Sequence, residues 1–280
     1  MRRPRLAFGL AVLCVAIGVP AHAWAATSGA TAARPVVHME ATVLAAQIDP
    51  RRADHTLTPG AESSVLAVEQ ALQALDLLQA QWVDGYFGTE TISAYAAYQR
   101  SLGYTGLDAT GLPGTTSLTQ LGRGRYTVRD TISPGARTER DGYVVDARTQ
   151  AMLAEAERLL GHALLLDQGS YNPGGDPTSA GTHDGGGVVD ISVTDLTAAE
   201  RTPAVRALRQ VGFAAWLRDP GQGDWPWHIH AAAINDTDLS SQAQHQVGDY
   251  YLGLNGLADH GPDDGPRIPI QTWEQYRRGH

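Results

Sequence analysis

The chain has 280 residues, 42% of them hydrophobic, and a formal net charge of −9 at pH 7. That length and apolar content leave room for two modest globular domains. The acidic balance argues against nucleic acid as a partner, because a protein that binds a polyphosphate normally presents a basic surface.

Residues 1–25 have the pattern of a secretory signal peptide. Arg2, Arg3 and Arg5 precede a short apolar run over 6–19, and small residues at 21–25 offer cleavage sites. The run is too short to be a membrane span. It contains Cys14, the only cysteine, so neither disulfides nor thiol chemistry are expected in the exported chain. The sequence therefore predicts a secreted protein, a monomer with no membrane partner after signal cleavage.

Residues 26–62 are rich in alanine, threonine, proline and arginine and show no sustained hydrophobic period. This composition is typical of a linker. The first folded unit is therefore expected over residues 63–122.

A helical pattern opens the 63–122 segment. Apolar residues recur there at the spacing of a helix with one inward-facing stripe: Val65, Leu66, Val68, Ala71, Leu72, Leu75 and Leu78. A turn at 83–91 leads into a second predicted helix that carries Ile92, Tyr95, Ala96 and Tyr98. A second turn at 107–114 precedes a short helix with Leu118 and Leu121. The pattern predicts a small three-helix module.

These turns resemble those of the three-helix peptidoglycan-binding module. Its signature, Val-Asp-Gly-x-Phe-Gly-x-x-Thr, is matched at residues 83–91, and its aromatic-Gln pair is matched by Tyr98-Gln99. In its second motif, Asp-Gly-x-x-Gly, Ala109 and Thr110 interrupt the match. The resemblance implies binding to cell-wall peptidoglycan. The same turn residues also suit a purely architectural role.

Residues 123–142 are charged and turn-rich, which indicates a connector, and a second domain is expected over 143–280. Asp146 is a predicted N-cap of a helix over 147–160, and Gly161 is placed to end it. The apolar run at 163–167 predicts a buried strand.

A Gly-rich turn and a short strand carry the first candidate metal ligands. Residues 181–187 read Gly-Thr-His-Asp-Gly-Gly-Gly, and the β-branched run that follows predicts a strand. Because side chains alternate along a strand, Asp190 should point away from the face that carries Val189 and Ile191. His183 would reach the same side from the turn. Asp184 could orient His183 or cap the turn.

In residues 228–230, His-Ile-His, the same alternation puts both imidazoles on one face. Either motif alone matches easily by chance, but in this order and at this separation they favour one site. Imidazole and carboxylate ligands suit zinc, and three protein ligands leave a fourth position for water.

At these residues the chain resembles the zinc D-alanyl-D-alanine peptidases, which share a fold with the hedgehog signalling domain. His183, Gly186 and Asp190 match their His-x-x-Gly-x-Ala-x-Asp core, with Val188 in place of the alanine. A helix and a Gly-Phe turn at 204–213 extend the resemblance across most of residues 140–240. In the actinobacterial carboxypeptidases the third ligand is the second histidine of a His-x-His. The resemblance therefore implies that His183, Asp190 and His230 bind zinc.

Tyr171 marks a departure from that family. Relatives have a Gly-x-Arg segment whose arginine binds the terminal carboxylate of the substrate, and Tyr171 is the matching position here. A phenol can hydrogen-bond a carboxylate or an amide but cannot form the bidentate charged pair of an arginine. Tyr171 is therefore the expected substrate-binding residue. Without the arginine, the sequence favours an endopeptidase or another amide hydrolase over a carboxypeptidase.

The general base departs as well. Many relatives carry Glu or Asp three residues before the last ligand, a position that Trp227 occupies here. His228 is the favoured base, because it shares a strand face with His230 and imidazole transfers protons near neutral pH. Asp224 is the alternative, if the turn after it folds back toward the metal. His228 could instead be a fourth ligand, which would close the site and favour a non-enzymatic role.

The whole sequence predicts an α+β fold, in which an N-terminal three-helix peptidoglycan-binding module precedes a hedgehog/DD-peptidase-like zinc domain. The expected function is that of a secreted, cell-wall-associated zinc metallopeptidase, similar to D-alanyl-D-alanine carboxypeptidases and endopeptidases, that hydrolyses peptide bonds of peptidoglycan. The alternative is a non-catalytic, zinc-containing wall-binding protein that has lost peptidase activity.

Overall fold

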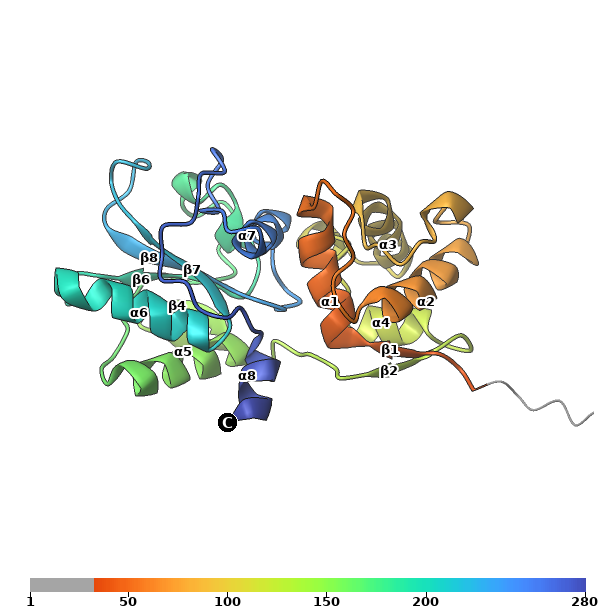
Figure 1. Ribbon diagram of the computed structural model, residues 1–280, viewed down its shortest axis with the longest axis horizontal. Helices are drawn as coiled ribbons and strands as arrows, with labels where there is room; N and C mark the ends of the chain where they lie inside the picture. The colour runs from red at the N-terminus through yellow and green to blue at the C-terminus, as the bar shows by residue number, and fades with distance from the viewer. Residues whose placement is uncertain (1–32) are drawn as a thin grey trace, which may run out of the picture. The chain divides into compact units, whose positions relative to one another are not determined.

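Four helices form the N-terminal part of the described chain (Figure 1). A computed structural model describes residues 33–280, and the predicted signal peptide at 1–25 lies outside them. The helices are α1 (Met39–Ile48), α2 (Glu62–Gln73), α3 (Thr89–Ser101) and α4 (Thr115–Leu121), joined by the 3-10 turns η1 (Asp49–Arg51), η2 (Ala80–Trp82) and η3 (Gly106–Ala109). Strand β1 (Val36–His38) pairs in parallel with β2 (Thr127–Arg129). This pairing brings the start and the end of the helical part together.

The three helices predicted within residues 63–122 are present as α2, α3 and α4. Val65, Leu72, Tyr95 and Leu118 are fully buried in one shared core. Helix α2 ends at Gln73, because Asp76 adopts a left-handed backbone conformation (φ 57°) that a right-handed helix cannot continue. The first helix is therefore shorter than the apolar spacing predicted.

Helix α1 corrects the prediction of a linker over 26–62. Met39, Val43 and Ile48 are almost fully buried, because α1 packs against both α2 and α7 (Ser241–Tyr251). A helix that is covered on several sides has no polar stripe. The amphipathic period that reveals a surface helix is therefore missing from this segment.

Strands also occupy much of the predicted connector at 123–142. Strand β2 lies within it, and β3 (Arg137–Arg140) forms an antiparallel hairpin with β4 (Tyr143–Asp146). Both β2 and β3 are short and have no fully buried residue. They lack the apolar run that predicts a strand from sequence.

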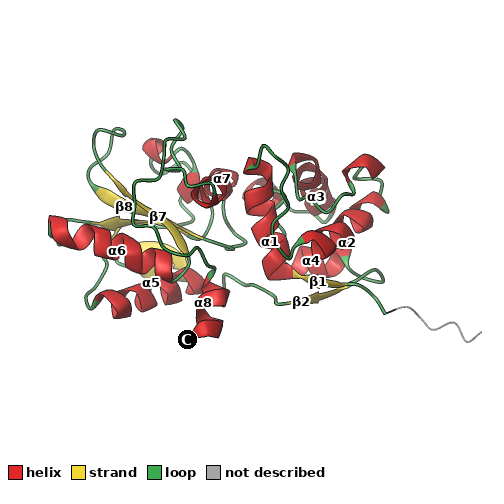
Figure 2. Ribbon diagram, viewed as in Figure 1, coloured by secondary structure: helices red, strands yellow, loops and turns green. Residues whose placement is uncertain are grey.

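A four-stranded antiparallel sheet organises the C-terminal part. Its strand order is β5-β6-β8-β7, with β5 (Leu166–Gln168), β6 (Val188–Ser192), β7 (Phe213–Arg218) and β8 (His228–Ala233). Helices α5 (Ala147–Leu160) and α6 (Ala198–Gln210) share an apolar core with one face, and α7 packs on the other (Figure 2). A short helix, α8 (Trp273–Gly279), follows near the C-terminus.

Helix α5 has the ends that the sequence predicted. The Asp146 carboxylate accepts a hydrogen bond from Thr149 N at 2.7 Å, which caps the first turn. Gly161 ends the helix in the left-handed conformation with φ 87°. The strand predicted at 163–167 is shorter and later, since β5 begins at Leu166.

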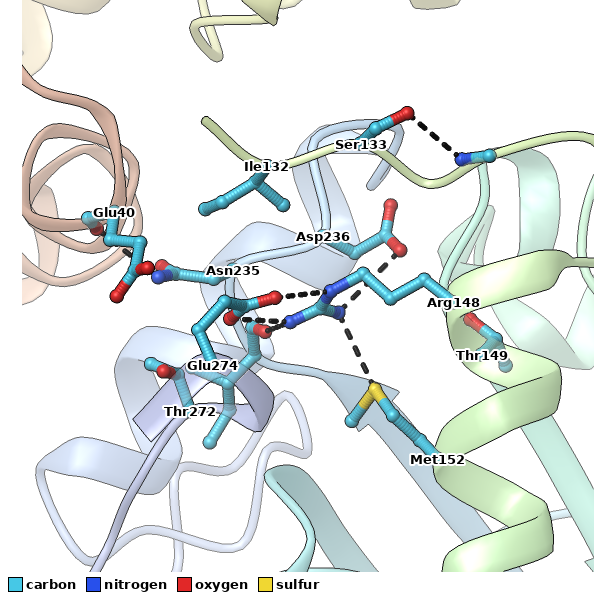
Figure 3. A network of polar contacts seen from close by, with 12 residues as sticks. Glu40, Ile132, Ser133, Arg148, Thr149, Met152, Asn235, Asp236, Thr272 and Glu274 are labelled. Atoms are coloured by element: carbon cyan, nitrogen blue, oxygen red, sulfur yellow. Dashed lines mark hydrogen bonds and ion pairs between the residues drawn. The ribbon is translucent and has the colours of Figure 1, made fainter. Parts of the chain in front are cut away.

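A buried arginine connects α5 to α8 and to the loop after β8 (Figure 3). Arg148 Nε and Nη2 donate to the Glu274 carboxylate at 2.8 and 3.0 Å, and Nη2 also donates to Ile234 O. Asp236, with no exposed surface, lies 3.7 Å from Arg148 Nη1. Burial and the nearby Asp146 raise the pKa of Asp236 well above its ordinary value, and Arg148 opposes that shift.

The described chain is thus a mixed α+β structure, as the sequence predicted. Its helical and sheet parts fall in one unit, Arg34–His280. Residues of α1 and α7 belong to the same buried apolar cluster. Within residues 33–280, no helix combines the length and the apolar character that a membrane crossing requires.

Candidate metal centre

A glycine-rich turn leads from the 3-10 turn η5 (Thr182–Asp184) into β6. Gly187 has a φ of 74°, which residues with a side chain rarely adopt. A Cβ on Gly185 would collide with the backbone of the loop that follows β8. These glycines let the turn fold tightly against that loop, and so they fix the position of His183 beside β6.

Strand register places two candidate ligands side by side. Asp190 of β6 lies directly opposite His230 of β8. Their neighbours Val189, Ile191 and Ile229 belong to the apolar core that includes α5 and α6. Asp190 and His230 therefore lie on the opposite face of the sheet, which confirms the predicted alternation of both segments.

His183 reaches this pair from η5. It is 1% exposed, and its Nδ1 donates to Gly169 O at 2.9 Å. Its other ring nitrogen, Nε2, lies 3.3 Å from Asp190 Oδ2. This buried Nε2 has no hydrogen-bond partner in the described chain.

His230 is held in the same way from its outer side. Gln246 of α7 donates from Nε2 to Gly256 O at 3.1 Å, which directs its Oε1 toward His230. Because that amide oxygen can only accept, His230 Nε2 carries the proton and donates to it at 2.8 Å. His230 Nδ1 faces Asp190 Oδ1, also at the hydrogen-bond distance of 2.8 Å.

Both imidazoles thus turn a ring nitrogen toward the same carboxylate, an arrangement that is stabilised either by a proton on the imidazole or by a metal ion bound between the groups. The three side chains offer ligand atoms that lie within 4.8 Å of one another. Outer hydrogen bonds that fix the tautomer and orientation of each imidazole are typical of metal-binding histidines. His183, Asp190 and His230 are therefore a group that could hold a metal ion.

The protonation equilibria of Asp190 and His230 point the same way, whereas the raised pKa of His183 favours its charged form. Burial alone would raise the pKa of Asp190, but His183 and His230 hold it well below its ordinary value. Burial lowers the pKa of His230, although Asp190 opposes the shift. Burial would also lower the pKa of His183, but Asp190 raises it. An ionised carboxylate and a neutral imidazole are the forms that bind metals.

His228 lies beside this group. Its Nδ1 donates to Pro226 O at 2.9 Å, and its Nε2 lies 3.7 Å from Asp190 Oδ1. His228 does not belong to the candidate metal group, whose ligand atoms from His183, Asp190 and His230 all lie within 4.8 Å of one another. Its Nε2 nevertheless faces the carboxylate of that group, as the shared strand face predicted.

The group lies in a cleft of about 560 Å³. His183, Asp190, His228 and His230 all line it. Trp225 and Trp227, from the segment before β8, add aromatic surface to the cleft, and Trp227 is 42% exposed. A volume of this size is within the usual range for sites that bind small molecules or short peptides.

Two predicted site residues are not among those that line this cleft. Asp224 is exposed on the loop between β7 and β8. Tyr171 lines a separate cavity, where its hydroxyl donates to Asp238 Oδ2 at 2.8 Å and its ring lies under Arg137. The position matched to the carboxylate-binding arginine is thus turned toward the loop after β8.

Asp184, the residue after His183, accepts a hydrogen bond from Gly174 N at 3.4 Å. The described contacts of the His183 ring involve Gly169 and Asp190, not Asp184. Asp184 therefore connects its turn to the preceding loop at Gly174, and its described hydrogen bonds show neither of the two roles considered for it.

Two residues of the cleft were not singled out from the sequence. Gln246 lies on α7, an ordinary amphipathic helix, and nothing in its neighbourhood marks it as a partner of His230. Arg218 ends β7 two residues after Trp216, so strand alternation on the His-facing side of the sheet would have been a usable signal.

Comparisons with protein-family models, with curated proteins and with solved structures found no match to this chain. The resemblance to zinc peptidases therefore rests on the motif residues themselves. His183, Asp190 and His230 among them come together in one group.

Proposed function

We propose that the protein is a secreted, zinc-dependent peptidase that hydrolyses peptide bonds of cell-wall peptidoglycan. One observation carries the proposal: His183 and His230 are each fixed by an outer hydrogen bond so that a ring nitrogen of each faces the Asp190 carboxylate. A metal ion bound by these three groups would replace the protons that otherwise link them.

Zinc suits this donor set better than a harder cation does. Two imidazole nitrogens and one carboxylate oxygen are common zinc ligands, whereas calcium and magnesium prefer oxygen. His183 Nε2 lies 3.3 Å from Asp190 Oδ2, and the ligand atoms of all three residues lie within 4.8 Å of one another.

When bound, zinc would polarise the carbonyl of a peptide bond and lower the pKa of water. His228 is placed to take up a proton beside it, because its Nδ1 proton is held by Pro226 O and its Nε2 is free to accept. The same imidazole could then donate the proton to the leaving amine. Asp224 is a weaker candidate, since it is exposed and absent from the cleft lining.

The choice of peptidoglycan as substrate draws on the N-terminal part. Residues 63–122 carry the turn motif that resembles a wall-binding module, and they contain helices α2, α3 and α4. A wall-binding module would hold the peptidase near its substrate and raise the effective concentration of that substrate.

Digestion of purified cell walls tests the proposal. The zinc-loaded full chain should release muropeptides with new termini, which mass spectrometry identifies. His183→Ala should release none, and Asp184→Asn should behave as wild type. A protein that metal analysis shows to hold zinc, but that produces no new termini, would overturn the peptidase assignment.

A second function, zinc-dependent wall binding without hydrolysis, is favoured by the position of Tyr171 and Asp224 outside the cleft lining. Under that alternative, the full chain sediments with cell walls and holds zinc while the muropeptide profile stays unchanged. The same digestion experiment, with sedimentation added, distinguishes the two.

A further inference from the structure

A second cavity of the described chain, about 350 Å³ in volume, shares no lining residue with the metal cleft. One wall belongs to the helical part, where Tyr104 follows α3 and Leu107 lies in η3. The opposite wall belongs to the sheet part and includes Tyr171, Gly185 and Asp238. The cavity therefore exists only where the two parts of the chain meet.

Direct contacts hold the two walls in place. Gln244 of α7 donates from Nε2 to Thr110 Oγ1 at 3.3 Å, which connects the sheet part to the helical wall. On the other wall, the Tyr171 hydroxyl donates to Asp238 Oδ2 at 2.8 Å. The guanidinium of Arg137 lies 3.8 Å from the centroid of the Tyr171 ring. Because the cavity is formed before a ligand arrives, less entropy is lost when one binds.

The lining has the groups that a neutral, hydroxyl-rich ligand requires. Its side-chain hydroxyls, which both donate and accept hydrogen bonds, include those of Thr110, Thr115, Thr116, Ser117, Ser133 and Thr237. The rings of Tyr104 and Tyr171 offer flat apolar surface. Carboxylates outnumber the single arginine, Arg137, so the cavity disfavours anions.

We propose that this cavity binds a neutral sugar unit. A sugar hydroxyl can donate to the carboxylates and can also exchange hydrogen bonds with the serine and threonine hydroxyls, whereas an ammonium group can only donate. The apolar face of a sugar ring suits the tyrosine rings. The inference rests on the proposed function, in which peptidoglycan is the substrate. It adds that both parts of the chain together bind the glycan strand, rather than the helical part alone.

The turn that carries His183 lies between the two sites. His183 lines the metal cleft, while Gly185, two residues later, lines the second cavity. Tyr171 N donates to Gly185 O at 2.7 Å, so the sugar-binding wall is bonded directly to this turn. A substrate that consists of a glycan with attached peptides has the two chemical parts that these neighbouring sites would bind.

Calorimetry with the full chain tests the proposal without requiring turnover. The probes are the trisaccharide of N-acetylglucosamine, which is neutral, and N-acetyl-lysine amide, which is cationic. We expect wild type to bind the trisaccharide and to bind the lysine derivative at least 10-fold more weakly. One variant from each wall, Tyr104→Ala and Asp238→Asn, should each weaken the trisaccharide about 10-fold, because each removes one contact with the sugar. Trp82→Ala removes an exposed aromatic ring of the helical part that lies outside the cavity lining, and it should bind as wild type does.

Thermal melting shows whether each variant is folded. If Tyr104→Ala is not, Asp108→Asn replaces it, since Asp108 is an exposed residue of the same wall. No binding of the trisaccharide by wild type would overturn the proposal, and so would tighter binding of the lysine derivative. Weakening by the helical-wall variant alone would place the sugar on the helical part and refute a shared site. Loss of binding in Trp82→Ala, with both cavity variants unaffected, would refute it too.

These outcomes do not depend on hydrolysis. A chain that releases new termini from cell walls but does not bind the trisaccharide refutes only this inference. A chain that binds the trisaccharide through both walls of the cavity, yet leaves the muropeptide profile unchanged, refutes only the peptidase assignment.

Discussion

His230 Nε2 lies 2.8 Å from Gln246 Oε1, and this contact joins the sheet to α7. Gln246 in turn donates to Gly256 O at 3.1 Å, so its amide cannot rotate without breaking a second hydrogen bond. The chain of contacts fixes the ring of His230 and turns its Nδ1 toward Asp190. Helix α7 contains none of the three candidate ligands, but through Gln246 it orients the ligand His230.

Gln246→Ala should weaken metal binding by about 10- to 100-fold, the usual effect of removing such an outer partner. The ring of His230 would be free to turn, and its Nδ1 would be protonated part of the time. Competition with a chromogenic chelator measures the affinity. Gln242→Ala, at an exposed position of the same helix, is the control. Equal affinities of the two variants would show that Gln246 does not position His230.

His183→Ala and Asp190→Ala should each abolish stoichiometric zinc binding, since each removes one of three ligands from a site that only the folded chain assembles. Elemental analysis of the purified proteins gives the zinc content, and the melting temperature with and without chelator gives the linked stability. Asp184→Asn, next to a ligand but outside the group, should retain the metal. A metal-free wild type whose melting temperature zinc does not raise would contradict the assignment.

His228→Ala should keep zinc and lose about 10²- to 10⁴-fold in the rate of peptide hydrolysis, the range for removal of a general base. The imidazole lies outside the set of mutually close ligand atoms, so its loss leaves three ligands in place. Zinc content and hydrolysis of wall peptides are measured on the same preparation. Loss of zinc would identify His228 as a fourth ligand, and retention of both zinc and activity would leave Asp224 as the next residue to test.

The candidate metal group could be assembled from the sequence because its members obey strand alternation. Asp190 and His230 each sit between buried aliphatic neighbours, and that local pattern determines which face they occupy. The register between β6 and β8, which places them opposite each other, cannot be read from either segment alone. Few registers, however, would bring both motifs to one point.

Other parts of the structure could not be predicted from the local sequence pattern. Helix α1 is covered by α2 and α7, so it has no polar stripe to reveal it, and its partner α7 comes some 200 residues later in the chain. The direction of Tyr171 was predicted by matching a motif position, but its φ of 56° turns the local chain away from a regular strand. Gln246 became a candidate only when the fold brought α7 to β8.

Glu274→Ala should lower the free energy of unfolding by about 3 kcal/mol, because it leaves Arg148 buried with only Asp236 as a more distant partner. Arg148 donates two hydrogen bonds to one carboxylate, and its charge is too deeply buried for water to replace them. Urea unfolding measures the effect. Arg158→Ala removes a pair on α5 that is largely exposed and should change the stability much less. A Glu274 effect as small as that of Arg158 would mean that α8 is not fixed by this pair.

Glu69 gives the helical part a distinct dependence on pH. Its carboxylate is fully buried and accepts hydrogen bonds from Asp84 N at 3.0 Å, Gly85 N at 2.8 Å and Thr91 Oγ1 at 2.9 Å. Burial raises its pKa from 4.5 to about 7, and these three donors only partly offset that rise. The turn at 83–91, which resembles the wall-binding motif, is thus held by a carboxyl group that titrates near neutral pH.

The sign of the resulting effect follows from proton linkage. Between pH 4.5 and 7 the folded chain holds a proton at Glu69 that the unfolded chain has already lost. The stability that this proton gives to the folded chain is therefore fully present below pH 4.5 and is lost as the pH rises through 7. The full change is about 3 kcal/mol. Urea unfolding at several pH values should therefore show a steeper loss of stability for wild type than for Glu69→Gln, which removes the titration. Glu90→Gln, at an exposed position of α3, is the matched control. If Glu69→Gln and wild type lose stability in parallel across this window, the carboxylate is ionised throughout and its three donors outweigh its burial.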